Sequence, residues 1–254
     1  KVRILNIIRN RGSIPRADLA KTSGLSAPTV TRLVDSLINI EGLVIDTGPT
    51  SSSGGRPPNM VEFNSKENFV IGLDIGGKIT GLLTDLDAKV ISQIEIPSMT
   101  GTLGLKAIME RTAKVVRDLV ESSGVSRDEI LGIGLATGGL VNKKKDIFEY
   151  ASTFDQSNVD FHQELGDLVG FPVVADNVTR VMALGELWYG VGRKYRNFVF
   201  VNVGLGIGAG IITNGQPFFG SSGMSGELGH IPLERDSKVR CHCGSSGCLE
   251  TLAS

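Results

Sequence analysis

Three cysteines and one histidine near the end of the 254-residue chain form a pattern that could bind a metal. Cys241, Cys243 and Cys248 are all the cysteines of the sequence, and His230 stands eleven residues before the first of them. Three thiolates and one imidazole are a complete tetrahedral ligand set for structural zinc. The tight Cys-x-Cys-Gly-x-x-Gly-Cys spacing favours a metal loop over a disulfide. A redox group and a chance cluster are the alternatives, and His242 inside the loop is a competing ligand.

Two glycine-rich turns are the second feature with chemical potential. Asp74-Ile75-Gly76-Gly77 ends one apolar segment, and Gly204-Leu205-Gly206-Ile207-Gly208 follows another. Glycine lets backbone N–H groups approach phosphate oxygens, and a nearby aspartate can hold magnesium. Either turn alone is a weak signal, because glycine also closes ordinary hairpins. Together, at the starts of two α/β lobes, they predict a two-lobed, actin-like nucleotide fold.

Charge is unevenly distributed along the chain. Residues 1–66 contain nine Lys or Arg and five Asp or Glu, whereas the remainder contains seventeen and twenty-two. A basic head on an acidic body is typical of a DNA-binding domain joined to a domain that does not bind DNA, although +4 is within the ordinary scatter for a small domain. No apolar run could span a bilayer and no secretory signal opens the sequence, so we expect a cytoplasmic protein without a membrane partner.

The first 66 residues have the pattern of a winged helix-turn-helix. Two short helical patterns precede a third helix, which Ser26 caps and which has Pro28 in its first turn. Apolar residues recur along this third helix at helical spacing: Val30, Leu33, Val34, Leu37 and Ile38. Apolar segments at 43–45 and 60–63, with a polar loop between them, then predict a β-hairpin.

The third helix and the hairpin loop carry groups that could read DNA. Thr29, Thr31 and Arg32 lie near the start of the helix, where an arginine can pair with guanine and a threonine can touch phosphate or a thymine methyl group. Arg56 stands between Gly-Gly and Pro-Pro in the loop and suits a narrow minor groove. Winged helices also serve as protein-interaction modules, but we expect DNA binding because both parts carry suitable groups.

From Asn68 onward the pattern is that of an α/β fold. The predicted strands are 69–75, 79–85, 89–95, 130–136 and 172–175, and the predicted helices are 103–122, 161–169 and 178–189. This meander followed by alternating elements is the layout of a ribonuclease H-like lobe. A second hairpin, 198–203 and 209–213, would open another lobe. The expected division is a DNA-binding domain over 1–66, a first lobe over 67–190 and the start of a second lobe over 191–254.

Three motifs together resemble the ROK family of sugar kinases and repressors. They are Gly72-Leu73-Asp74-Ile75-Gly76-Gly77, Gly226-Glu227-Leu228-Gly229-His230, and the Cys-x-Cys-Gly-x-x-Gly-Cys-Leu-Glu run from Cys241. The resemblance extends from about residue 67 to the end, and the winged helix matches the repressor branch. It implies an α/β fold with an N-terminal winged helix-turn-helix and an actin-like, ribonuclease H-like ATPase-type ROK domain. Family members continue further, so we expect the second lobe to be truncated at the C-terminus.

The resemblance also implies roles for three groups of residues. In kinase members a nucleotide cleft is lined by the equivalents of Asp74, Gly76, Gly77, Gly204, Gly206 and Gly208. Sugar contacts would come from Asn177, Glu227, His230 and Gly139. Structural zinc would be held by His230, Cys241, Cys243 and Cys248.

The sequence departs from the kinase pattern where phosphoryl transfer needs specific groups. Kinase members carry Asn-Asp-x-Asn, in which the aspartate is the general base. The corresponding residues are Asn177-Val178-Thr179-Arg180, and Val178 cannot accept a proton. Asp176 would need a shifted register to replace it. Further departures are the threonines missing at Gly77-Lys78 and Gly204-Leu205-Gly206, and Gly138-Gly139 in place of a Pro-Gly pair.

These features predict a sugar-responsive, DNA-binding transcriptional regulator, a repressor of carbohydrate metabolism with a degenerate kinase site and no enzymatic activity. Its expected partners are operator DNA, a sugar effector and further copies of itself in a homodimer or a dimer of dimers. Its expected cofactor is zinc, without ATP or magnesium. The alternatives are an ATP-dependent, glucokinase-like sugar kinase with an accessory DNA-binding domain, and a regulator that binds a phosphorylated protein or a transporter instead of a sugar.

Overall fold

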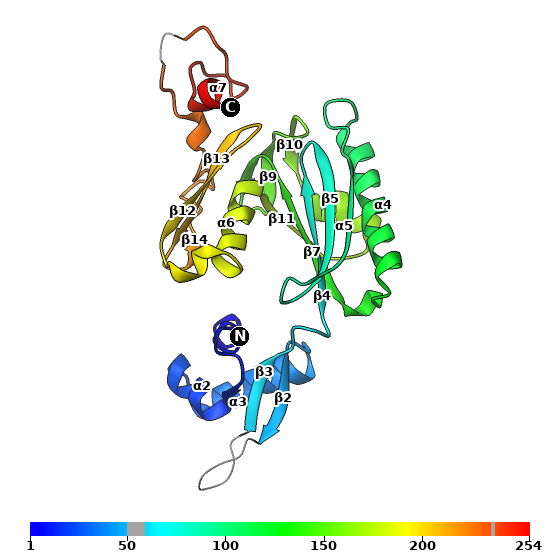
Figure 1. Cartoon of the computed structure of the whole chain (residues 1–254), viewed down its shortest axis with the longest axis vertical. Helices are drawn as coiled ribbons and strands as arrows, with labels where there is room; N and C mark the ends of the chain where they lie inside the picture. The colour runs from blue at the N-terminus through cyan, green and yellow to red at the C-terminus, as the bar shows by residue number, and fades with distance from the viewer. Residues whose placement is uncertain (50–58, 235–236) are drawn as a thin grey trace. The chain divides into compact units, whose positions relative to one another are not determined.

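The computed structural model of the chain divides into two compact units (Figure 1). The described residues are 1–49, 59–234 and 237–254. Unit 1 comprises Lys1–Val70, Thr84–Lys89 and Ser126–Ile130, and unit 2 comprises Ile71–Leu83, Val90–Val125 and Leu131–Ser254. No helix in the described ranges combines the length and the apolar character that a bilayer crossing requires.

Unit 1 contains a winged helix-turn-helix. Its elements are α1 (Val2–Arg11), β1 (Ile14–Pro15), α2 (Arg16–Ser23), α3 (Ala27–Asn39), β2 (Val44–Pro49) and β3 (Asn59–Phe63). Strand β3 pairs antiparallel with β1 on one side and β2 on the other. Ser26 Oγ accepts a hydrogen bond from the Thr29 N–H, and Gly24 ends α2 in a left-handed conformation. The predicted cap of the third helix is therefore confirmed, whereas β1 is too short for any sequence pattern to predict.

One apolar core holds the helices and the hairpin of unit 1 together. Its buried members are Ile4, Ile8, Ile14, Leu19, Val30, Val34, Leu37, Val44 and Val61. Three of them come from the predicted apolar stripe of α3. Because that stripe faces the core, the polar residues Thr31 and Arg32 on the opposite face of α3 are exposed.

Unit 2 is built around a five-stranded sheet with the order β11-β7-β4-β5-β6. Its strands are β4 (Phe69–Ile75), β5 (Lys78–Asp85), β6 (Val90–Pro97), β7 (Ile130–Thr137) and β11 (Val173–Asn177). β11 runs parallel to β7 with Asn177 opposite Thr137. The carboxyl ends of these two strands therefore meet at one edge of the sheet, and the loops that follow them lie close together.

Three helices pack around this sheet. Helices α4 (Leu105–Ser123) and α5 (Phe161–Val169) pack against each other, and α6 (Val178–Trp188) follows β11 directly and also contacts β12 and β13 (Figure 1). A small antiparallel sheet lies between β7 and α5 in the chain and consists of β8 (Leu140–Asn142), β9 (Ile147–Ala151) and β10 (Gln156–Val159). The sequence did not predict it, because strands of three to five residues leave little room for an alternating pattern.

The predicted second hairpin is present as β12 (Phe198–Val203) and β13 (Ile207–Thr213), with β14 (Gln216–Pro217) paired to β13. The remaining elements are 3-10 turns at Arg127–Glu129, Val191–Lys194 and Leu228–His230, and the short helix α7 (Leu249–Ala253).

The packing of β13 on α6 leaves no room for a side chain at Gly210. A Cβ there would lie 2.4 Å from Ala183 Cβ and 2.6 Å from Thr179 O. We expect Gly210→Ala to lower the free energy of unfolding by about 1–3 kcal/mol, the usual cost of overpacking. Gly185→Ala, inside α6 with no atom within 4 Å of the added Cβ, is the matched control and should raise stability by about 0.5–1 kcal/mol. Urea unfolding of both variants checks this, and equal stabilities would contradict the close contact.

Candidate functional sites

The four predicted metal ligands converge in unit 2. The ligand atoms of His230, Cys241, Cys243 and Cys248 all lie within 4.8 Å of one another. Cys243 Sγ is 3.8 Å from Cys248 Sγ, and Cys241 Sγ is 3.5 Å from His230 Nδ1. A tetrahedral zinc ion with Zn–S bonds of about 2.3 Å and Zn–N bonds of about 2.0 Å has ligand–ligand edges of about 3.8 Å and 3.5 Å. The donor set and its spacing therefore fit zinc.

Glycine geometry folds the loop that presents the cysteines. Gly244 and Gly247 have φ values of +90° and +64°, which residues with side chains rarely adopt. A Cβ at Gly247 would also lie 1.8 Å from Glu234 O. The Cys241 N–H donates to Ser245 O at 2.9 Å and closes the turn. The glycines of the motif thus allow the chain to reverse tightly enough to bring the sulfurs together.

The Cys243 and Cys248 thiols have shifted pKa values. Burial, followed by the neighbouring Cys243 thiol, raises the pKa of Cys248 to about 11. A backbone hydrogen bond at Ser245 lowers the pKa of Cys243. A coordinating metal deprotonates its thiol ligands, so metal binding at such a cluster releases protons.

The competing ligand His242 is directed at a carboxylate. Its Nδ1 lies 3.2 Å from Glu250 Oε1, and its ring stands edge-on to His230 with the centroids 5.0 Å apart. His230, His242 and Glu250 also form a second close group of ligand atoms. The set with three sulfurs agrees better with the ligand preference of structural zinc, because it supplies four donors of the usual types.

His230 faces the cysteine cluster with one ring nitrogen and an acidic residue with the other. Its Nδ1 lies toward Cys241, and its Nε2 is 3.8 Å from Glu227 Oε2. The pKa of Glu227 is raised, because the effect of burial is larger than the opposing effect of the His230 and Arg180 charges. Two of the predicted sugar ligands therefore lie side by side. A metal on Nδ1 would fix the direction of the Nε2 atom.

The other two predicted sugar ligands are joined by a hydrogen bond. Asn177 Nδ2 donates to Gly139 O at 2.9 Å, and Asn177 Oδ1 accepts from the Thr179 and Arg180 N–H groups. They meet because β11 and β7 are parallel neighbours whose carboxyl ends share one edge. A Cβ at Gly139 would lie 2.3 Å from Tyr150 O, so the backbone of β9 packs directly against this position.

Val178 begins α6 and stands at the predicted position of the kinase general base. The nearest acidic residue before it in the sequence, Asp176, makes contacts with other side chains. Asp176 Oδ1 accepts from Arg180 Nη1 at 2.7 Å and from the Asn177 N–H at 2.7 Å, and Asp176 Oδ2 lies 2.9 Å from Lys143 Nζ. Both carboxylate oxygens of Asp176 are therefore occupied by cationic or N–H partners. The contacts of Asp176 thus join β11 to the first turn of α6 and to Lys143.

Both predicted phosphate turns are closed by their own backbone. Gly76 and Gly77 lie between β4 and β5, and the Gly76 N–H donates to Lys78 O. Lys78 Nζ is paired with Glu95 at 2.6 Å. Asp74, near the end of β4, is exposed, although partial desolvation raises its pKa.

The second turn has a similar arrangement and reveals a residue that the sequence analysis missed. Gly204 and Gly206 connect β12 to β13, which contains Gly208, and the Gly204 N–H donates to Gly206 O. The Ile207 N–H donates to Glu250 Oε2 at 2.7 Å. Glu250 therefore links this turn to His242. The sequence signal that could have indicated Glu250 is its position in the Cys-Leu-Glu run.

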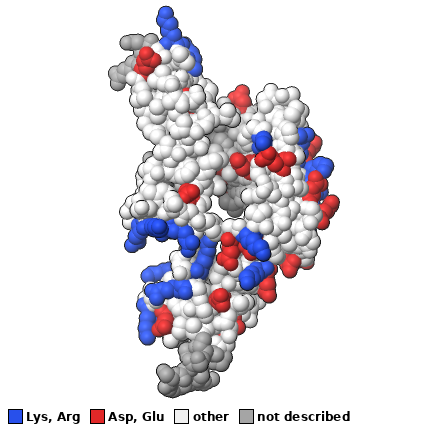
Figure 2. Space-filling model, viewed as in Figure 1, with Lys and Arg blue, Asp and Glu red and all other residues white. Residues whose placement is uncertain are grey.

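The predicted DNA-reading residues have different surroundings on α3. Thr31 and Arg32 are exposed, whereas Thr29 is half-buried and its Oγ1 is 2.8 Å from Ser26 Oγ at the helix cap. Arg56 lies outside the described residues. Figure 2 shows Lys and Arg side chains on the visible face of unit 1, which contains α3. The Arg16 guanidinium of α2 pairs with Asp35 of α3 at 2.6 Å and links the two helices.

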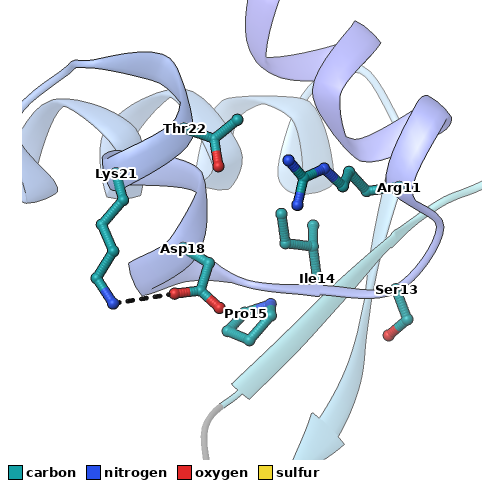
Figure 3. A pocket seen from close by; sticks show the side chains of 7 residues that line it. All are labelled: Arg11, Ser13, Ile14, Pro15, Asp18, Lys21 and Thr22. Carbon is teal, nitrogen blue, oxygen red and sulfur yellow. Dashed lines mark hydrogen bonds and ion pairs between the residues drawn. The ribbon is translucent and has the colours of Figure 1, made fainter.

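A depression of about 400 Å³ lies between α1, β1 and α2 (Figure 3). Its lining consists of Arg11, Ser13, Ile14, Pro15, Asp18, Lys21 and Thr22. Lys21 Nζ is 3.2 Å from Asp18 Oδ1, which offsets part of its positive charge. None of the described DNA-reading residues lines this depression.

Comparisons with known proteins cover both parts of the chain. Residues 70–254 match the ROK family, and residues 1–41 match a winged helix-turn-helix DNA-binding family. The chain is 32% identical over 259 residues to the xylose repressor of Caldicellulosiruptor bescii, covering all of this chain and 63% of that protein. It therefore spans less than two thirds of this relative.

Two crystal structures are also similar. A ROK family transcriptional regulator described as a homolog of the E. coli MLC protein has a TM-score of 0.84 and 30% identity, covering 99% of this chain and 63% of that chain. A ROK family glucokinase from Streptomyces griseus in complex with glucose and AMPPNP has a TM-score of 0.66 and 28% identity, covering 74% of this chain and 57% of that chain.

Proposed function

The chain belongs to the ROK family, and on that premise we propose that it is the DNA-binding and sensing part of a sugar-responsive transcriptional repressor. One combination of features carries the proposal. The groups suited to sugar hydroxyls are kept, as Asn177 with Gly139 and Glu227 with His230, while Val178 occupies the base position and Asp176 is held in ion pairs. Sugar binding without phosphoryl transfer is the function of a sensor.

Zinc has a structural role in this proposal. His230, Cys241, Cys243 and Cys248 would hold the ion, whose charge stabilises the thiolates and fixes the loop. With its Nδ1 on the metal, His230 would present Nε2 beside Glu227, where both can bind a hydroxyl group. Glu250, bonded to His242 and to the second glycine turn, adds a further carboxylate close to His230.

The winged helix would read operator DNA with α3. Thr31 and Arg32 would contact base edges, Thr29 would support the helix start, and Arg56 would reach the minor groove. A homodimer or a dimer of dimers would match a two-fold operator. A sugar can release DNA only if it binds the operator-bound and the free arrangements with different affinity.

We expect the full-length protein to bind a sugar and to transfer no measurable phosphate from ATP. D-xylose and D-glucose are the first probes, because the similar proteins include a xylose repressor and a glucokinase complexed with glucose. Thermal shift measures binding, since a ligand at 100 times its Kd stabilises the fold by about 2.7 kcal/mol. Glu227→Gln should weaken sugar binding about tenfold or more, because a hydrogen bond to a charged group contributes about 1.5–3 kcal/mol.

Phosphorylation by the wild type would overturn the proposal in favour of the ATP-dependent kinase with an accessory DNA-binding domain. Val178→Asp is the informative comparison, because a general base typically contributes about 10²–10⁴-fold to the rate. Operator binding that no sugar changes, together with capture of a phosphorylated protein or a transporter, would favour the third alternative.

A further inference from the structure

One buried side chain fastens the loop that leads to Glu227 and His230. Arg180, in the first turn of α6, is 4% exposed. Its Nη2 donates to Gly223 O at 3.0 Å, and its guanidinium carbon lies 4.8 Å from the centroid of the Phe219 ring. The loop over 218–226 is therefore attached to α6 by a hydrogen bond and by a cation–π contact.

A second set of contacts holds Arg180 itself in place. Arg180 Nη1 donates to Asp176 Oδ1 at 2.7 Å, and Lys143 Nζ lies 2.9 Å from Asp176 Oδ2. Lys143 Nζ also lies 5.7 Å from the centroid of the Phe219 ring. Phe219 thus contacts two cations, and Asp176 supplies the anion between them. Removing one partner of so buried a pair leaves an uncompensated charge, which is strongly destabilising.

The loop backbone also rests directly on β8. Gly223 has a φ of +80°, and a Cβ there would lie 2.2 Å from Val141 O. Three residues further on, Gly226 O accepts the Ala209 N–H of β13 at 2.7 Å. The loop is therefore held near β8 and α6 at one end and to β13 at the other, immediately before Glu227.

We infer that Arg180 is a positioning residue, which holds the 218–226 loop against β8 and α6 and so keeps Glu227 and His230 in register with Asn177 and Gly139. The inference rests on the proposed function, because it concerns the same sugar pocket. Asn177 ends β11 and Gly139 follows β7, whereas Glu227 and His230 lie in and beside a 3-10 turn after β14, so the placement of the two pairs needs a link. Arg180 falls on the last position of the Asn-Asp-x-Asn motif of kinase members, so the side chain that makes this link is a departure of this chain.

The test uses the full-length protein with Arg180→Lys and Phe219→Leu. Lysine keeps the charge but lacks the planar fork that reaches Asp176 and Gly223 together, and leucine removes the cation–π contact. Arg193→Lys, at an exposed arginine beyond α6, is the matched control. The measurements are hydrogen exchange of residues 218–226, the Kd for D-xylose and D-glucose, and operator affinity without sugar.

We expect both variants to raise exchange in the loop at least about tenfold while α4 keeps its protection. The Kd for the sugar that the wild type binds should rise about tenfold or more, and operator affinity without sugar should stay within about twofold. A merely structural role would lower operator affinity and protection throughout the domain.

Unchanged loop exchange in the variants that fold would overturn the inference, and so would a looser loop with an unchanged sugar Kd. If the wild type binds neither sugar, the proposed function is the part that fails. In that case the exchange rates still decide whether Arg180 fastens the loop. If Arg180→Lys fails to fold, Phe219→Leu alone decides, because it leaves the ion pairs intact.

Discussion

Cys248→Ser is expected to abolish stoichiometric zinc binding and to lower the melting temperature by about 10 °C or more. Cys248 is fully buried, its sulfur lies 3.8 Å from Cys243 Sγ, and it immediately precedes α7. Structural zinc sites supply about 10–16 kcal/mol of apparent binding free energy, which is coupled to folding. Loss of even about 4 kcal/mol shifts the melting temperature of a domain of this size by about 8–16 °C. Zinc per chain and thermal unfolding check this result.

His242→Asn is the matched control for the metal site. It changes the competing ligand and leaves the three sulfurs and His230 in place, so zinc should remain at one ion per chain. Because His242 Nδ1 lies closer to Glu250 Oε1, at 3.2 Å, than to Cys241 Sγ, at 4.0 Å, its loss should alter sugar binding more than stability. A protein that retains zinc after Cys248→Ser and loses it after His242→Asn would assign the metal to the other group of ligands.

Arg32→Ala is expected to reduce operator affinity by a factor of about 30 to 10⁴. A bidentate arginine–guanine contact is worth about 1–3 kcal/mol of discrimination, and a dimer on a two-fold operator loses the contact twice. The exposed position of Arg32 on α3, opposite the buried face formed by Val30, Val34 and Leu37, carries this expectation. Binding to random DNA should fall much less, because phosphate contacts are kept.

Lys21→Ala is the control for the DNA-binding surface. Lys21 is an exposed cation of the same unit but lies on α2, where it is paired with Asp18. We expect its replacement to change operator affinity less than about threefold. Equal losses for Lys21→Ala and Arg32→Ala, on operator and on random DNA alike, would show that α3 contributes only general electrostatic attraction.

Much of the fold was predictable because its signals are local. The third helix of the winged helix-turn-helix has a cap, a proline in the first turn and an apolar stripe, and all three are found at α3. The strands at 69–75 and 198–203 and the helix at 161–169 were predicted with the limits that the structure shows, since each is bounded by a turn signal. The three short strands over 140–159 were missed, because their pairing depends on residues distant in the sequence.

The sequence alone determined the potential ligand types of the cysteine–histidine cluster, the apolar face of α3 and the valine at position 178. Each of these depends on side-chain chemistry at short spacing. Only the tertiary structure decided the partners of Asp176, the hydrogen bond between Asn177 and Gly139, and the attachment of the 218–226 loop by Arg180. These contacts join residues up to 43 positions apart in the chain, and no local pattern can specify such a distance. The parallel pairing of β7 with β11 and the packing of α6 on β13 bring them together.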